Sequence, residues 1–213
     1  MRRAPIVAIL LTGLIPAAAS AADDPATFEW TKEQFDLVAT GDSEEGEKLA
    51  KKFKCKKCHN EDGISDDEEV PSIAGPRATY TYKQLHDFKS GIREDDDMKK
   101  ATRKLNEEDM VHLSAWFASL DRPAMVGGDP LLQVKVCNSC HDKDIVEKDN
   151  HIEVAPILIG QIRQYLEASM MQFKDAGRSN DLYDRMQSVT HKLNQDEIKK
   201  LARYYGAEDL PQE

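Results

Sequence analysis

The hydrophobic and polar positions along this chain repeat with the period of an α-helix, and no stretch alternates as a half-buried β-strand does. Two segments show the clearest apolar stripes, and each follows an asparagine that can cap a helix, Asn106 and Asn194. The pattern therefore predicts an all-α fold. The stripes consist of Met110, Leu113, Trp116, Phe117 and Leu120 in the first segment and of Ile198, Leu201, Tyr204 and Tyr205 in the second.

Two further helices are expected nearer the N-terminus. Asp42 begins a capping-box pattern, and the segment after it starts with acidic residues and ends with lysines, as the helix dipole favours. Tyr82, Leu85 and Phe88 mark one apolar face of another helix, which Gly91 can terminate.

All four cysteines lie in two copies of one pentapeptide, Cys-x-x-Cys-His, at 55–59 and 137–141. Landmarks around both pentapeptides recur at matching spacings, which indicates a duplication. The repeat predicts two tandem domains of about three helices each, at 42–120 and 128–206, with a linker at 121–127. The matching pairs are Gly46 and Gly128, Pro71 and Pro156, Gly75 and Gly160, Tyr80 and Tyr165, Phe88 and Phe173, and Met98 and Met186.

Residues 1–21 have the three-part layout of a secretory signal peptide. A basic start is followed by a short apolar run and an alanine-rich stretch, and cleavage is expected near Ala21. The apolar run is too short to span a bilayer, which disfavours the alternative of an uncleaved anchor. We expect a periplasmic protein with at most peripheral membrane association. Residues 22–41 form an N-terminal extension that the sequence does not place, and 207–213 form a C-terminal tail.

Composition narrows the class of protein further. The 213 residues include 29 basic and 39 acidic side chains, and the net charge of −10 argues against nucleic-acid binding. Aromatic residues make up only 7% of the chain, too few to fill two small cores made of peptide alone. Something bulky and apolar is therefore expected inside each domain.

The Cys-x-x-Cys-His pentapeptide is the attachment pattern of c-type haem. Its two thiols can form thioethers with the vinyl groups of one haem, and the histidine that follows can reach the iron. A redox disulfide needs no such histidine, and a structural zinc site would have to join two separate repeats. The sequence predicts two covalently bound haem c groups, attached to Cys55, Cys58, Cys137 and Cys140, with His59 and His141 as axial iron ligands.

The second axial ligand should be the same residue type at matching positions of both domains. Met98 and Met186 correspond, and each is expected in a polar loop before the final helix. The alternative is a methionine that fills a gap in the core, which the charged neighbours of both residues disfavour. A thioether sulfur would complete a His/Met pair, which raises the reduction potential and suits electron transfer.

With these motifs the sequence resembles the dihaem cytochromes c of the cytochrome c4 type, in which two class I cytochrome c domains share one exported chain. The resemblance runs from about Gly46 to Gly206 and includes both pentapeptides. It implies the same attachment and axial residues as above. It also implies that the carbonyl groups of Pro71 and Pro156 accept a hydrogen bond from the histidine bound to the iron.

The predicted function is that of an electron carrier and not an enzyme. It would pass single electrons between redox proteins such as a quinol-oxidising complex, a terminal oxidase or a periplasmic dehydrogenase. One alternative is the electron-accepting subunit of an oxidoreductase complex, such as flavocytochrome c sulfide dehydrogenase. Another is a haem enzyme such as a peroxidase, which needs an open axial position. Lysines near the first pentapeptide form either a docking ring for an acidic partner or an ordinary solvated face.

Overall fold

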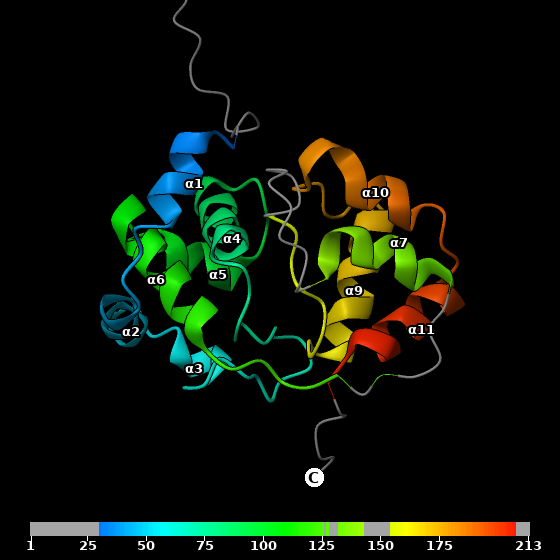
Figure 1. Ribbon diagram of the computed structural model, residues 1–213, viewed down its shortest axis with the longest axis horizontal. Helices are drawn as coiled ribbons and strands as arrows, with labels where there is room; N and C mark the ends of the chain where they lie inside the picture. The colour runs from blue at the N-terminus through cyan, green and yellow to red at the C-terminus, as the bar shows by residue number, and fades with distance from the viewer. Residues whose placement is uncertain (1–29, 126, 128–131, 143–153, 208–213) are drawn as a thin grey trace, which may run out of the picture.

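The computed structural model describes residues 30–125, 127, 132–142 and 154–207. This part of the chain is helical, and its isolated β-bridge pairs Gln161 with Gly206. Figure 1 shows two groups of helices side by side, α1 to α6 in one and α7 to α11 in the other. We call them the first unit and the second unit. The expected all-α architecture is confirmed.

The helices of the first unit begin and end largely where the sequence predicts. Asp42 caps α2 by accepting a hydrogen bond from the backbone N–H of Glu44 at 2.8 Å. Gly91 ends α4 with a φ of 82°, and Asn106 caps α6 in a capping box with Asp109. The bounds are Lys32–Val38 for α1, Ser43–Lys52 for α2, Lys56–His59 for α3, Ala78–Ser90 for α4, Asp96–Thr102 for α5 and Glu107–Ser119 for α6.

The second unit repeats two long helices of the first, with α9 (Arg163–Lys174) matching α4 and α11 (Gln195–Tyr205) matching α6. Asn194 caps its last helix in a capping box with Glu197, as Asn106 does in the first unit. A short 3-10 turn, η2, covers Leu182–Asp184 and leads into α10. The helices are α7 at Leu132–His141, α9 at Arg163–Lys174, α10 at Arg185–Thr190 and α11 at Gln195–Tyr205.

The prediction of about three helices in each domain is wrong because several short helices were missed. Within the predicted domains, α3, α5 and α10 have between 4 and 7 residues, too few to show a helical period in the sequence. The prediction that Met98 and Met186 lie in polar loops is wrong for the same reason. Met98 lies in α5, and Met186 lies in α10.

Helices α2 and α6 of the first unit cross in close contact at Gly46. A Cβ atom at this position would lie 2.1 Å from the carbonyl oxygen of His112 and 2.6 Å from the Cβ of Trp116. Only glycine permits this approach, which brings Leu49 and Leu113 into one buried cluster. Gly128, the matching glycine of the duplication, lies outside the described residues.

The described part of the N-terminal extension belongs to the first unit. The Trp30 ring lies 5.0 Å from that of Phe35 and 5.9 Å from that of Tyr82, and Val38 of α1 is buried in the same cluster. The predicted signal peptide at 1–21 and most of the tail lie outside the described residues. No helix in the described ranges is long and apolar enough to cross a membrane.

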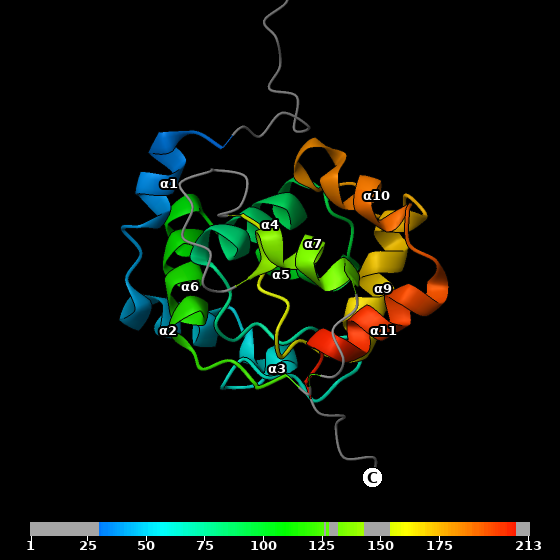
Figure 2. The same ribbon diagram turned by 45° about the vertical axis from the view of Figure 1, so that its right-hand side comes forward.

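The extended segment after α6 contacts both units. In Figures 1 and 2 it passes near α3 and the C-terminal end of α11. The guanidinium of Arg122 donates to the carbonyl oxygens of Ile157 and Ile159, at 3.1 and 3.0 Å, and also to that of Gly75. The half-buried side chain of Arg122 therefore connects the segment to a turn of each unit.

Candidate haem-binding site

A cavity of about 770 Å³ is lined by residues of both units. Its walls include apolar side chains of α4, α6 and α9, among them Phe88, Phe117 and Leu166. A large apolar space agrees with the expectation that peptide alone does not fill these units. All eight predicted site residues line it: Cys55, Cys58, His59, Met98, Cys137, Cys140, His141 and Met186.

The two histidines are held in the same way. Nδ1 of His59 lies 2.9 Å from the carbonyl oxygen of Pro71, and Nδ1 of His141 lies 2.6 Å from that of Pro156. These are the hydrogen bonds that the resemblance implied. When Nδ1 donates the proton, Nε2 keeps its lone pair and can bind a metal.

Burial sets the protonation state of both histidine rings. His59 and His141 are each 7% exposed, and desolvation lowers the pKa of both rings below the ordinary value. The rings are therefore neutral at pH 7, which is the form that an iron ligand needs.

Each pair of cysteines lies on one turn of helix. Cys55 precedes α3 with helical backbone angles and Cys58 lies within it, while Cys137 and Cys140 lie in α7. Residues three apart share one face of a helix, so both thiols of a pair can reach one ligand. Burial raises the pKa of the Cys55 thiol to about 11 and also raises that of Cys137. Burial therefore keeps the Cys55 and Cys137 thiols protonated at neutral pH.

The two methionines occupy matching local structures. The carboxylate of Asp95 accepts from the backbone N–H of Met98 at 2.8 Å, and that of Asp181 accepts from the backbone N–H of Met186 at 2.6 Å. An aspartate therefore fixes each short helix at the residue that faces the cavity. The threonines that donate to the methionine carbonyl oxygens, at 2.8 Å in both units, are Thr102 and Thr190.

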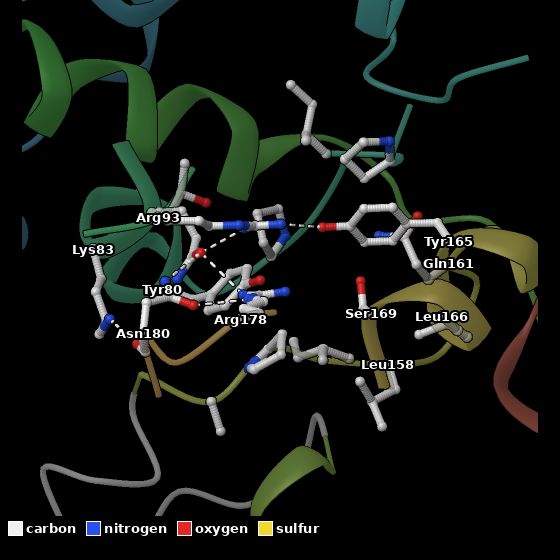
Figure 3. A pocket seen from close by; sticks show the side chains of 18 of the residues that line it. Tyr80, Lys83, Arg93, Leu158, Gln161, Tyr165, Leu166, Ser169, Arg178 and Asn180 are labelled. Carbon is white, nitrogen blue, oxygen red and sulfur yellow. Dashed lines mark hydrogen bonds between the residues drawn. The ribbon is translucent and has the colours of Figure 1, made fainter. Parts of the chain in front are cut away.

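Sequence reasoning missed a polar cluster where the two units meet. Arg93 donates to the hydroxyl of Tyr165 at 2.8 Å and to Oε1 of Gln84 at 2.6 Å, and Arg178 donates to the same Oε1 at 3.2 Å (Figure 3). The two arginines occupy matching positions in the duplication and both line the cavity. Because a haem carries two carboxylates, these guanidinium groups fit its acidic edge.

No sequence signal links these residues, because 72 positions separate Arg93 from Tyr165 and 94 separate Gln84 from Arg178. The contact with Arg93 changes the pKa of the Tyr165 hydroxyl. Although desolvation alone would raise the pKa of Tyr165, the nearby guanidinium groups of Arg93 and Arg178 lower it to about 8.

This helical fold, with a Cys-x-x-Cys-His motif and a methionine helix in each half, is that of the cytochromes c. A cytochrome c family model matches residues 43–121. The chain is 30% identical to cytochrome c4 of Pseudomonas aeruginosa over 183 residues, which are 78% of this chain and 88% of that protein. The chain belongs to the cytochrome c4 family.

Two further similarities agree with this family. The crystal structure of reduced recombinant cytochrome c4 from Pseudomonas stutzeri matches with a TM-score of 0.68 and 27% identity, covering 78% of this chain and 98% of that one. A thiosulfate dehydrogenase electron acceptor of Stutzerimonas stutzeri is 27% identical over 170 residues, which are 71% of this chain and 77% of that protein. The protein is thus a dihaem electron-transfer cytochrome with two covalently bound haem c groups, and not an enzyme.

Proposed function

We propose that each unit binds one haem c through its own pentapeptide. Cys55 and Cys58 form the thioethers in the first unit, and Cys137 and Cys140 form them in the second. His59 with Met98 and His141 with Met186 are the axial pairs. The domains extend over 42–120 and 128–206, with 121–127 as the linker. The observation that carries this assignment is the matched placement of all eight side chains around one apolar cavity.

The chain's own groups explain why this arrangement favours electron transfer. A haem held by His59 and Met98, or by His141 and Met186, would supply one-electron iron chemistry and would leave no open position for a substrate. The carbonyls of Pro71 and Pro156 orient both imidazoles, and burial keeps the two rings neutral. Asp95 and Asp181 fix the helical turns that carry the Met98 and Met186 thioethers. These turns therefore need to rearrange little when a haem gains or loses an electron.

The axial assignment is tested with Met98→Ala and Met186→Ala in the oxidised holoprotein. Each variant should lose about half of the sulfur-to-iron charge-transfer absorption, because each removes one of two thioether ligands. Met110→Ile is the matched control, since Met110 is buried in α6 and the duplication places Ile198 at its position. An unchanged band in Met98→Ala or Met186→Ala would exclude that methionine as a ligand.

We also propose that the protein functions in the periplasm after cleavage near Ala21. The support is the three-part layout of residues 1–21. Haem attachment would also use all four cysteines, so no free thiol would remain in an oxidising compartment. Mass spectrometry of protein from a periplasmic fraction should give a chain that starts near Ala22 and carries two added haems. A mass that includes residues 1–21 would contradict the cleavage.

The electron partners that we propose are a quinol-oxidising complex, a terminal oxidase or a periplasmic dehydrogenase. The similarity to a thiosulfate dehydrogenase electron acceptor favours a second candidate role, the electron-accepting partner of such a dehydrogenase. Stopped-flow reduction separates the two roles. A carrier of the respiratory chain is reduced fastest by the quinol-oxidising complex, whereas a dedicated acceptor is reduced fastest by the dehydrogenase.

A further inference from the structure

Helix α4 of the first unit contacts the second unit through a buried polar face. Lys83, Gln84 and Asp87 of this helix are only 6%, 9% and 1% exposed. They bond to the segment 178–180 of the second unit (Figure 3). We call these three residues the α4 clamp.

The contacts of the clamp converge on one residue, Asn180. The Lys83 ammonium forms a buried ion pair with Asp87 and donates to the backbone carbonyl oxygen of Asn180 at 2.5 Å. The Asn180 amide donates to the Asp87 carboxylate at 2.6 Å and to Oε1 of Gln84 at 3.2 Å. Arg178 donates to the Asn180 side-chain oxygen at 2.7 Å. Both the backbone and the side chain of Asn180 are therefore fixed, largely by the first unit.

The residue after Asn180 is the aspartate that fixes Met186. Asp181 accepts from the backbone N–H of Met186 at 2.6 Å and from that of Gln187 at 3.2 Å. The clamp thus acts on the peptide next to Asp181. Between Asp181 and the first residue of α10, Tyr183 and Asp184 both have left-handed backbone angles, with φ values of 59° and 52°. Two such residues in a row are strained and depend on firm anchoring at both ends.

The first unit holds its own methionine helix mainly through its own groups, although Arg93 donates to the Tyr165 hydroxyl of the second unit at 2.8 Å. Within the described residues, the hydrogen bonds of Asp95 and Met98 stay inside the first unit. The matching positions of the clamp in α9 carry no charged group. Ala168 corresponds to Lys83, Ser169 to Gln84 and Gln172 to Asp87, and both Ala168 and Gln172 are exposed. Apart from the Arg93–Tyr165 bond, the described support that one unit gives to the methionine segment of the other therefore runs from α4 to the second unit.

We propose that Lys83, Gln84 and Asp87 are positioning residues for Met186, so that the first unit sets the iron coordination, and with it the reduction potential, of the second haem. The proposal rests on the proposed role of Met186. It makes the potential of the second haem depend on the contact between the units, while the potential of the first haem does not depend on it.

The main test is the double variant Lys83→Met/Asp87→Leu, studied as holoprotein. Removing both charges together avoids leaving one buried charge unpaired. We expect a lower potential for the second haem and a shifted or broadened NMR signal of its methionine methyl group in the reduced protein, with both values unchanged for the first haem. The two signals are assigned with Met98→Ala and Met186→Ala. Gln172→Leu, the matching position in α9, is the control and should leave both haems unchanged.

A milder variant keeps the test decisive if the double variant does not fold. Asn180→Ala removes hydrogen bonds of the clamp without burying a charge, and it should affect the second haem alone. Equal changes at both haems would show a general loss of stability and overturn the proposal, as would no change at either. If Met186→Ala leaves both methyl signals in place, Met186 is not a ligand, and the proposed ligand set fails together with this inference.

Discussion

The two units share the contacts that place their chemical groups but differ in what supports those contacts. In both, a proline carbonyl orients a histidine and an aspartate fixes a methionine helix. In the first unit, Trp30 and α1 also pack against the core. The second unit has a methionine segment that is bonded to α4 of its neighbour. The duplication thus retained the site geometry while its supporting contacts diverged.

The largest effect should come from removing one pentapeptide at a time. Cys55→Ala/Cys58→Ala and Cys137→Ala/Cys140→Ala should each halve the haem content measured by mass spectrometry. Because α4 lines the cavity and also carries the clamp, loss of the first haem should disturb the second as well. Loss of the second haem should leave the potential of the first unchanged. If the loss of either haem changes the potential of the other to the same extent, the proposed difference between the two units is wrong.

The helix crossing of the first unit is tested by Gly46→Ala. The new methyl group would overlap the carbonyl oxygen of His112, so the free energy of unfolding should fall by about 2–3 kcal/mol. Thermal unfolding of the holoprotein measures the loss. Gly177→Ala in the second unit is the control, because its Cβ would lie 3.8 Å from the nearest atom, the carbonyl oxygen of Gln172. A similar loss in both variants would contradict the role of the crossing.

The clamp should add stability that depends on pH. Burial of Asp87 opposes its ionisation, but the nearby His86 ring, the charge of Lys83 and the hydrogen bonds from Lys83 and Asn180 outweigh this effect and hold the pKa of Asp87 below its ordinary value. Its contribution is present above the unfolded-state pKa of about 3.9 and is lost as the pH falls below it. Asp87→Asn should therefore cost about 1–3 kcal/mol at pH 7 and less below pH ~4.

Urea unfolding of the holoprotein at several pH values measures this dependence. Asp97→Asn is the control, because the Asp97 side chain is 91% exposed and its ion pair with Lys100 is a surface contact. A cost of Asp87→Asn that stays constant down to pH ~3 would argue against an ionised Asp87 in the native clamp.

The smallest effect concerns the lysines beside the first pentapeptide. Lys51 and Lys56 lie within 2.8 and 3.7 Å of Glu47, so the basic ring is partly neutralised, while Lys57 is exposed. Lys57→Glu should slow electron exchange with an acidic partner by about threefold at low salt and have little effect at high salt. Lys48→Glu is the control, since Lys48 already pairs with Glu45. Equal rates for the two variants would favour an ordinary solvated face.

The sequence by itself determined the features that depend on residues a few positions apart in the chain. The caps at Asp42, Asn106 and Asn194 act within three residues of each helix start and were predicted correctly. The pentapeptides specify covalent chemistry at fixed spacing, and the duplication selected Met98 and Met186 from the other methionines. These predicted residues all line the cavity. Short helices such as α5 and α10 escaped prediction because one or two turns show no period.

Only the tertiary structure decided how the two units depend on each other. Asn180 meets Asp87 across 93 positions of sequence, and Arg93 meets Tyr165 across 72. A polar residue that bonds to a distant segment looks the same in the sequence as one that faces water. Burial makes the difference, because a desolvated donor or charge must find a partner, and the partner is set by packing between the units.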